Sequence, residues 1–427
     1  MTPLLAFTAS LLALAPSSQL SLKNIKLVEG GGGFSPCEPS IAISKTNTNN
    51  IVAGVILDRA FATTDGGKTW KATQIKSKFG VWGDPTIVSD ASGGFYYFHL
   101  SNTGGDGWID RIVCQKSTDG GLTWSDGAGF GHNPPADQDK QWATTHPTKN
   151  WIYATWTQFD KYASRDPKMH SNIMFSMSQD GGVTWGAAKA INDISGDCLD
   201  DDKTTEGAVP AVGPDGKIYV AWANQDVIWF DKSADNGKTW LPHDIPVARQ
   251  FGGWNMTIPG IQRSNGMPVL MIDNSAKATK GNLYLVWGDQ RNSVDDSDIL
   301  FSRSTDGGNT WSAPMTVNQD KSGKHQFLPW MAVDSSTGYI YIVYYDRRNY
   351  TDLQTDVMIA YSIDGGKTFV ERTLSESPFT PTQSVFFGDY NNISAHGGVI
   401  APIWTRMDGG KTSVWTAVIR HSDLLKR

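Results

Sequence analysis

The sequence is poor in the features that identify several large protein classes. Its 427 residues include only three cysteines, Cys37, Cys114 and Cys198, so at most one disulfide can form within the chain. Formal net charge is −6, so there is no basic footprint of the kind that nucleic acid requires. After the first residues, no apolar run is long enough to span a membrane. We therefore expect a globular, acidic protein with no nucleic-acid partner and no membrane span.

Readable catalytic and metal-binding patterns are also missing. The histidines show no metal-ligand spacing, and no Ser-His-Asp set is legible. Glycine, by contrast, is abundant, with 44 residues, and aromatic residues make up 11% of the chain. This composition is typical of many short strands joined by tight turns.

One eight-residue motif recurs through the chain. It reads Ser/Thr-x-Asp-x-Gly-x-Thr-aromatic, and its six copies lie at residues 63–70, 117–124, 178–185, 233–240, 304–311 and 362–369. The Asp carboxylate can accept hydrogen bonds from backbone N–H groups a few residues on, and the Gly permits a positive φ, so the octet predicts a turn between two strands. Repetition at intervals of 54 to 71 residues predicts a propeller or a solenoid.

Strand-like segments complete the repeat. Alternating and β-branched runs, such as residues 51–57 and 340–345, precede each octet and are bounded by Gly, Asn and Asp. A seventh set, which ends with residues 413–419, has three strands and no octet, and the strand-like run 22–28 would supply the missing fourth. The sequence thus predicts an all-β, seven-bladed β-propeller of four-stranded blades whose last blade is closed by the N-terminal strand.

The domain organisation follows from the uninterrupted repeat. We expect one domain over residues 19–427, in which the fifth blade starts near Ile258, and we expect a monomer. Residues 1–18 contain an apolar run followed by small residues, which favours a signal peptide over a buried strand or helix, although no Lys or Arg precedes the run. The predicted location is secreted or periplasmic.

The octet resembles the Asp-box, or bacterial neuraminidase repeat, of the sialidase-like β-propellers, over nearly the whole chain after the leader. This resemblance implies a propeller that acts on a glycan or glycoconjugate as a glycoside hydrolase or lyase. The alternatives are a non-catalytic propeller that binds carbohydrate or protein, and a metal-stabilised scaffold. Sialidases carry a Phe/Tyr-Arg-Ile-Pro motif near the first strand, and this chain has Glu38-Pro39-Ser40-Ile41 there. The missing motif argues against cleavage of sialic acid.

Acidic residues recur at one register before the inner strands. Counting three residues back from the first apolar position of each strand gives Glu38, Asp84, Asp139, Glu206, Asn255, Phe327 and Asp389. Because inner strands surround the propeller axis, the five carboxylates are predicted to rim the central funnel on the face opposite the octets. Like charges so close need a cation, arginines or protons. Ca²⁺ is a candidate cofactor, but no spacing identifies a metal site. The alternative is that the acids are structural acceptors of inter-blade hydrogen bonds.

Two further sets of side chains are expected on the same face. Arginines stand beside aspartates at the ends of second strands, at Arg59, Arg291, Arg347 and Arg406, and aromatic residues lie in or beside the loops, at Trp82, Trp254 and Trp330. The structural alternative is that the Asp–Arg pairs are salt bridges within blades and that the aromatics belong to the core.

The resemblance also implies roles. It makes Tyr390 with Glu206 a candidate nucleophile pair, Asp84 a candidate acid/base, and Arg59, Arg291 and Arg347 a candidate clamp for an anionic group. Asp389 joins the candidate catalytic set. The remaining candidates for substrate contact are Glu38, Asp139, Arg406, Trp82, Trp254 and Trp330.

Overall fold

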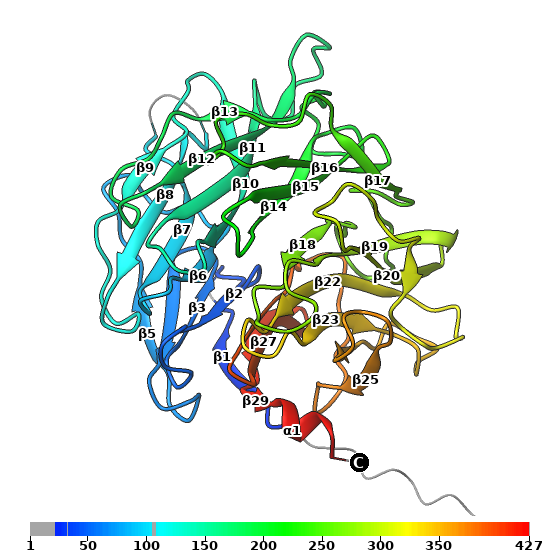
Figure 1. Cartoon of the computed structure of the whole chain (residues 1–427). Coiled ribbons are helices and arrows are strands. Elements are labelled where there is room, and N and C mark those ends of the chain that lie inside the picture. The colour runs from blue at the N-terminus through cyan, green and yellow to red at the C-terminus, as the bar shows by residue number, and fades with distance from the viewer. Residues whose placement is uncertain (1–21, 32, 105–107, 427) are drawn as a thin grey trace, which may run out of the picture.

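The computed structural model describes residues 22–31, 33–104 and 108–426, so the predicted leader at 1–18 lies outside the described residues. The described chain forms seven antiparallel sheets arranged as blades around one axis. In Figure 1 the first strands of the blades lie toward the centre and the fourth strands at the periphery. The predicted seven-bladed β-propeller is confirmed.

Six blades consist of four consecutive strands each. The first two blades are β2 (Ser40–Ile43), β3 (Ile51–Val55), β4 (Arg59–Thr63), β5 (Lys71–Gln74), and β6 (Thr86–Ser89), β7 (Phe95–Ser101), β8 (Arg111–Ser117), β9 (Ala128–Phe130). The next two are β10 (Asp137–Thr145), β11 (Ile152–Phe159), β12 (Ser171–Ser178), β13 (Lys189–Ala190), and β14 (Glu206–Val212), β15 (Ile218–Asn224), β16 (Val227–Ser233), β17 (Ile245–Arg249). The fifth and sixth are β18 (Val269–Ile272), β19 (Leu283–Ser293), β20 (Asp296–Ser304), β21 (Met315–Thr316), and β22 (Gln326–Val333), β23 (Ile340–Asp346), β24 (Asp356–Ser362), β25 (Val370–Thr373).

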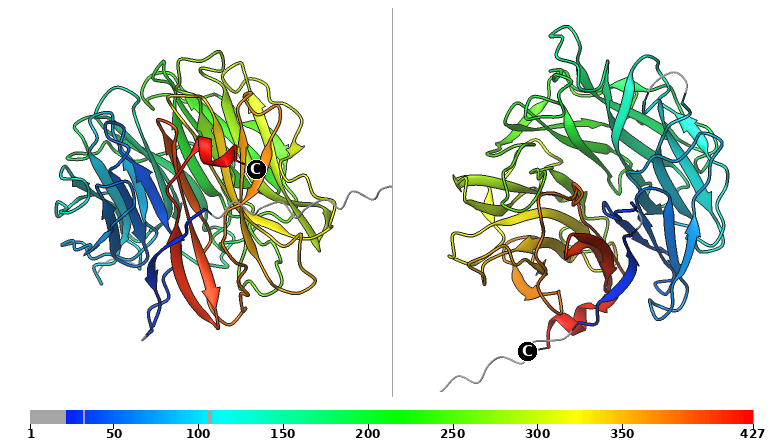
Figure 2. Two further views of the ribbon diagram at one scale, coloured as in Figure 1. Left: turned by 90° about the horizontal axis from the view of Figure 1, so that it is seen from below. Right: turned by 180° about the vertical axis from the view of Figure 1, so that it is seen from behind.

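The seventh blade joins the two ends of the chain. It contains β26 (Asn392–His396), β27 (Val399–Asp408) and β28 (Lys411–Thr416), and β1 (Ile25–Glu29) pairs with β28 as the fourth strand. Figure 2 shows the blue β1 beside the red C-terminal strands. The short β29 (Ile419–Arg420) pairs with β27, and α1 (His421–Leu424) follows it. The predicted closure by the N-terminal strand is confirmed, and it covers two strand edges that would otherwise be open.

The octets join third strands to fourth strands, as predicted. In the fifth blade, Asp306 Oδ1 accepts hydrogen bonds from the Thr310 N–H at 3.0 Å and from the Ser304 hydroxyl at 2.8 Å, and Oδ2 accepts from the Thr310 hydroxyl at 2.6 Å. These bonds from Thr310 and Ser304 lower the pKa of Asp306 to about 2. Each octet is therefore a local turn held by one carboxylate.

The octet aromatics also link neighbouring blades. Trp240 packs edge-on against Phe175 of the preceding blade, with ring centroids 5.1 Å apart, and Trp311 packs against Phe230 at 5.4 Å. Phe369 packs against Phe301 at 5.1 Å in the same way. The repeat therefore stabilises the interfaces between blades as well as the turns.

The start of the fifth blade differs from the prediction. Its inner strand β18 begins at Val269, and Ile258 lies in the preceding loop, in which Met256 and Ser264 form an isolated bridge. Ile258 and Ile261 are apolar because they are buried under this loop. The sequence pattern of this buried loop is therefore the same as that of a strand. Asn255, which was counted from Ile258, does not belong to the inner-strand register.

No helix in the described part of the chain is long and apolar enough to cross a membrane. Cys37, Cys114 and Cys198 are all free and buried.

Candidate active site on the loop face

The two faces of the propeller carry different segments. We call the face with the octets the octet face, and the opposite face, with the loops from second to third strands and from fourth strands to the next blade, the loop face. The connections between blades on the loop face span residues 30–39, 75–85, 131–136, 191–205, 250–268, 317–325 and 374–391. The predicted acidic residues lie on or beside these connections.

The backbone places one residue of several blades in the same strained position. Glu38, Asp84 and Lys140 have φ values of 51°, 49° and 52°. Glu38 and Asp84 stand two residues before the paired start of β2 and β6, and Lys140 stands two residues before Trp142, where pairing in β10 resumes after a register shift. Register shifts after Asp139 and Glu206 mark β-bulges, which insert one extra residue. Because of the bulge, Lys140 rather than Asp139 is the structural equivalent of Glu38 and Asp84. Counting along the sequence missed this shift of one residue.

Lys140 lies at the centre of the acidic set. Its Nζ is 2.6 Å from Asp389 Oδ2, 3.5 Å from Asp84 Oδ2 and 3.9 Å from Glu38 Oε1, and the residue is only 4% exposed. Burial alone would lower the pKa of Lys140, but Asp389, Asp84 and Glu38 outweigh it and raise this pKa well above its usual value. A buried ammonium thus holds three of the five predicted carboxylates together.

Arg263 adds a second positive charge. Its Nε donates to Asp389 Oδ1 at 2.8 Å, its Nη2 pairs with Asp389 Oδ2, and its Nη1 donates to Asp200 Oδ2 at 2.9 Å. Burial would raise the pKa of Asp389, but Lys140 and then Arg263 outweigh it and lower that pKa to about 2. The Arg263 side chain is 34% exposed, so the buried charge cluster reaches solvent through its guanidinium.

Asp200 connects this cluster to two aromatic residues. Its Oδ2 also accepts a hydrogen bond from the Tyr162 hydroxyl at 2.7 Å, and its Oδ1 accepts one from the Trp254 indole N–H at 3.0 Å. Burial and the charge of Asp200 raise the pKa of Tyr162. Tyr162 is half-buried, so its phenol lies between the charge cluster and solvent.

Three other acids are pushed toward their protonated forms. Burial, followed by the charge of Asp84, raises the pKa of Glu38 well above its usual value, despite Lys140. Burial raises the pKa of Asp139 to about 7, and burial followed by Asp200 and Asp139 raises that of Glu206. Glu206 Oε2 accepts from the Thr157 hydroxyl at 3.3 Å, and its Oε1 has no hydrogen-bond partner among the described residues.

Tyr390 lies in a layer of aromatic rings next to the Lys140 cluster, on the side of the octet face. Its ring lies 4.8 Å from that of Trp142 and 6.1 Å from that of Trp330, and the residue is 3% exposed. Burial, then Asp84 and Glu38, raises the pKa of its phenol. The hydroxyl has no hydrogen-bond partner among the described residues, so the structure does not join Tyr390 to Glu206 as the predicted pair.

The four predicted arginines lie apart from the cluster. Arg59 stacks over Phe34 at 4.7 Å. Arg291 Nε and Nη2 bind Asp289 at 2.9 and 3.0 Å, and Arg406 forms the same kind of paired contact with Asp408. These contacts fit the structural alternative of salt bridges within blades.

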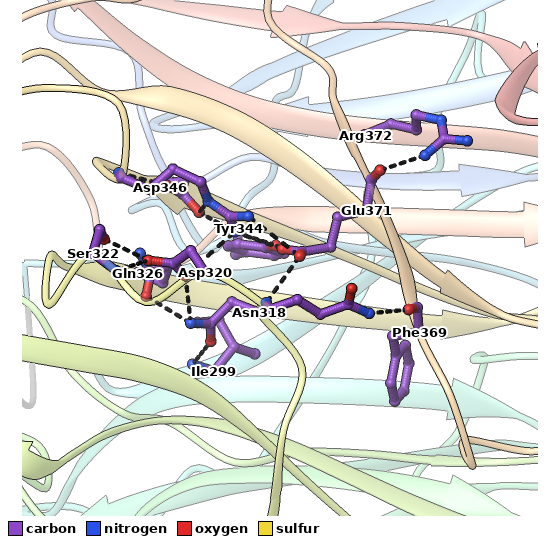
Figure 3. A network of polar contacts seen from close by, with 12 residues as sticks. Ile299, Asn318, Asp320, Ser322, Gln326, Tyr344, Asp346, Phe369, Glu371 and Arg372 are labelled. Carbon is purple, nitrogen blue, oxygen red and sulfur yellow. Dashed lines mark hydrogen bonds and ion pairs between the residues drawn. The ribbon is translucent and has the colours of Figure 1, made fainter. Parts of the chain in front are cut away.

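Arg347 was expected to pair with the neighbouring Asp346, but Arg348 forms that pair. Arg348, and not Arg347, binds Asp346, with Nε 2.8 Å from Oδ2, and it also donates to Glu371 at 2.5 Å. Figure 3 shows this network, in which Asp346, Tyr344 and Glu371 converge between β23 and β25. Arg347 is buried, stacks over Phe327 and donates to the Pro259 carbonyl at 2.7 Å, while its Nη2 has no partner among the described residues. Burial lowers its pKa to about 10.

Exposed apolar side chains gather on the loop face. Trp82 is 40% exposed and Trp108 44% exposed, and Trp108 packs edge-on against Tyr162 with ring centroids 4.9 Å apart. Leu57, Leu199, Phe251 and Val294 are exposed on loops of the same face. Trp254 and Trp330, by contrast, are buried.

The cluster contains its own cation. Lys140 holds Asp389, Asp84 and Glu38, which are carboxylates that the sequence offered to Ca²⁺. Within residues 22–31, 33–104 and 108–426, no group of three or more His, Cys, Asp or Glu residues has an arrangement that could hold a metal ion.

Sequence reasoning missed Lys140, Arg263, Asp200 and Tyr162. Lys140 had a local signal, because it directly follows Asp139 in the acidic register. Arg263 and Asp200 lie in the long connections 250–268 and 191–205, where no periodicity places a side chain. Their meeting with Asp389 brings together residues far apart in the chain.

Comparisons with known proteins agree with this fold. No family model matches the chain. A sialidase from Bacteroides fragilis is 26% identical over 176 residues, a match that covers 36% of this chain and 30% of that sialidase. Among solved structures, an ulvan lyase of a polysaccharide lyase family has a TM-score of 0.56 at 14% identity and is covered over 99% of its length by 93% of this chain.

Sialidase structures give similar values. A point mutant of the NanB sialidase from Streptococcus pneumoniae has a TM-score of 0.52 at 10% identity, with 79% of this chain and 68% of that chain covered. The leech intramolecular trans-sialidase has a TM-score of 0.50 at 11% identity, with 80% and 68% covered. The seven blades and these likenesses show that the fold of the chain is similar to that of the sialidase-like β-propellers. At these identities the likeness is one of fold, and a single fold hosts many activities.

Proposed function

We propose that the protein acts on a glycan at the loop face, over the cluster of Lys140, Asp389 and Arg263, as a glycoside hydrolase or a polysaccharide lyase. One observation carries this proposal. Asp389, whose pKa is lowered to about 2, and Glu38, whose pKa is raised, both lie within 3.9 Å of one ammonium. Titratable groups with pKa values pushed apart in one site are the usual arrangement for acid and base roles.

The surroundings of the cluster suit a sugar. Trp82 and Trp108 expose their indoles on the same face, where they can stack on the C–H faces of a sugar ring. Arg263 and Tyr162 supply hydrogen-bonding groups between these aromatics and the buried carboxylates. The names of the similar proteins, a sialidase and an ulvan lyase, agree with a glycan as the ligand.

The roles of individual residues follow their access to the ligand. Asp84, whose side chain is 13% exposed, is the most accessible of the three acids around Lys140 and is our candidate for proton transfer to or from the sugar. Asp389 would remain ionised and hold Lys140 and Arg263 in position. Tyr162, with its hydrogen bond to Asp200, is the phenol that a ligand reaches first, whereas Tyr390 lies in the buried layer.

A second candidate is a non-catalytic glycan-binding propeller. Burial favours it, because Glu206 and Asp389 are almost fully enclosed. In this version the charge cluster supports the face, and the exposed aromatics supply the binding. For both candidate functions we propose a secreted or periplasmic location and a monomeric state.

The two candidates are separated by assaying binding and cleavage on the same protein. A glycan array and a panel of neutral and acidic polysaccharides would identify ligands, while new reducing ends would report hydrolysis and ultraviolet absorbance of an unsaturated uronate would report lyase cleavage. For the enzyme we expect cleavage that Asp84→Asn reduces at least about 100-fold, the usual size of a general acid–base contribution. Binding should persist in that variant, and the octet variant Asp235→Asn should cleave normally.

Other outcomes would be equally decisive. Binding without cleavage by the wild-type protein would establish the second candidate. A protein that neither binds nor cleaves any glycan in the panel would overturn the proposal.

A further inference from the structure

The axis of the propeller contains a cavity that opens on the octet face. An inner chamber of 170 Å³ lies between the inner strands and is lined by residues of all seven blades. It shares Lys45, Thr144 and Met271 with a wider chamber of 400 Å³ at the octet-face ends of the same strands. We call the two chambers together the octet-face funnel. Lys45 and Thr148 are exposed at its rim, so the funnel is accessible from solvent.

The opposite end of the funnel is closed. Trp142 and Trp330 line the inner chamber and pack with ring centroids 4.4 Å apart, and Tyr390 packs against Trp142 at 4.8 Å. Beyond this layer lies the cluster of Lys140. The octet-face funnel is therefore a separate compartment from the candidate active site.

The polar groups of the funnel include several that are ready for a ligand. His146 Nδ1 accepts the N–H groups of Thr148 and Lys149 at 3.1 and 3.2 Å, so the neutral imidazole carries its proton on Nε2 as a donor. Asn274 Nδ2 donates to the Val212 carbonyl at 3.0 Å, while Asn274 Oδ1 is buried with no partner among the described residues.

Lys45 supplies a charge that the protein does not compensate by contact. The side chain forms no ion pair within the part of the chain that the structure describes. Burial lowers the pKa of Lys45, and Asp334 opposes this effect at longer range. The Asp334 carboxylate itself accepts the N–H groups of Ser336, Gly397 and Gly398 at 2.8, 3.1 and 2.7 Å. The funnel therefore offers a cation to a ligand without a competing acid at the same place.

Apolar side chains form part of the wall, beside hydroxyl groups such as those of Thr145 and Ser335. Val212, Met271, Ile272 and Val333 line the wide chamber between the polar groups. A volume of 400 Å³ lies within the usual range for small-molecule pockets, roughly 300–1,000 Å³. A mixture of apolar side chains and a few polar groups is also typical of such pockets. The chemistry selects an anion with an apolar body.

We propose that the octet-face funnel binds a small organic carboxylate. The carboxylate pairs with Lys45 at the rim, and the apolar body lies along Met271 and Val333 toward the inner chamber. His146, whose Nε2–H is a donor, lines the same wide chamber. This site is distinct from the glycan site of the loop face and stands independently of it.

The test uses octanoate as the probe and octanamide, of the same chain length, as its uncharged match. Isothermal titration of the full chain should give one octanoate site, and octanamide should bind at least about tenfold more weakly, a difference of about 1.4 kcal/mol. Lys45→Met keeps the aliphatic stem and should reduce octanoate affinity to that of octanamide. Lys238→Met removes an exposed lysine of an octet outside the funnel and should leave octanoate binding unchanged.

A second variant tests the position of the apolar body. Met271→Trp should fill the funnel and abolish binding of both probes, with circular dichroism used to verify that the variant is folded. In the wild-type protein labelled with ¹⁵N-histidine, octanoate should shift the His146 ring signals.

Two results would overturn the proposal. One is the absence of octanoate binding up to about 10 mM, which is weaker than any specific small-ligand site of interest. The other is equal octanoate affinity in wild type and Lys45→Met. Neither result bears on glycan binding at the loop face, which these variants leave untouched.

Discussion

The two ends of the propeller axis are built from the same seven inner strands and yet differ completely. At the loop-face end, Lys140, Asp389, Asp84 and Glu38 fill the axis with buried charge. At the octet-face end the axis is open, and Lys45 stands alone among apolar and neutral groups. The backbone symmetry of a propeller brings equivalent positions together, but the side chains at those positions decide whether the axis becomes a charge cluster or a cavity.

The difference teaches where each kind of chemistry is possible. A buried cluster can push pKa values apart because water is excluded and charges interact strongly. The octet-face funnel has no comparable cluster of carboxylates, but its cavity leaves space for a ligand. We therefore propose acid–base chemistry at the first end and small-ligand binding at the second.

Among the changes considered, removal of Lys140 should have the largest effect on the free energy of unfolding. Lys140→Met leaves three buried carboxylates without their shared cation, and we expect a loss of about 3–5 kcal/mol in the free energy of unfolding at pH 7. The loss should shrink at pH 5, because without Lys140 the folded-state pKa values of Asp389 and Glu38 rise and protonation then favours the folded protein. Urea unfolding at both pH values measures this, with Lys238→Met as the control. A variant as stable as wild type at pH 7 would contradict the cluster.

Loss of the closing strand should be the next largest effect. Deletion of residues 22–29 removes β1 and exposes the edge of β28, where Ile25 pairs with Thr416 and Glu29 with Ser413. We expect a loss of about 3 kcal/mol from the lost strand hydrogen bonds and the buried parts of Ile25 and Val28. Thermal unfolding would measure it, and a truncated protein that melts at the parent temperature would show that the closure contributes nothing.

A smaller effect concerns the pH dependence of the loop-face end. The folded-state pKa of Asp139 is raised to about 7 by burial, so the folded protein binds this proton more tightly than the unfolded chain does, and stability falls as the pH rises from about 4 through 7. Asp139→Asn removes this dependence and keeps the acceptor for the Lys140 N–H. Relative to wild type it should gain about 1–3 kcal/mol at pH 8 and little at pH 4. A constant difference across that range would refute the assignment.

The smallest effect is expected in the octets. Asp306→Ala removes the carboxylate that holds one turn and should cost about 1 kcal/mol, with no change in glycan or octanoate binding. The folded-state pKa is depressed to about 2, so this contribution is present above pH 4 and is lost as the pH falls through 2. Melting curves at pH 7 and pH 2.5, and both binding assays, test it. Lost binding with unchanged melting would reverse our assignment of the faces.

Much of the fold was predictable because its signals are local. The donors and acceptors that hold the turn at residues 304–311 lie within the octet itself. The run that forms β1 has the pattern of a strand. The fifth blade was the exception, because Ile258 is buried in a loop and does not belong to a strand. Local patterns cannot separate these two reasons for apolarity.

The candidate site was predictable only in part. Five acids near the axis were found by counting, and three of them do meet at Lys140. The bulge after Asp139 shifted the register by one residue and hid the lysine. The arginine of the cluster came from a connection between blades, Arg263, while the predicted Arg291 and Arg406 bind their own neighbouring aspartates.

The sequence by itself determined the blades and their turns, since these depend on hydrogen bonds and periodicities within a few residues. It also determined the number of blades and their closure, because the repeats can be counted and one strand-like run at the start matches one missing strand at the end. Only the tertiary structure decided which side chains meet on the axis. Lys140, Arg263 and Asp389 come from three blades or connections, and their pKa values depend on distances between them and on the exclusion of water. The same holds for the octet-face funnel, whose cavity exists only because seven separate strands leave space at one end and fill it at the other.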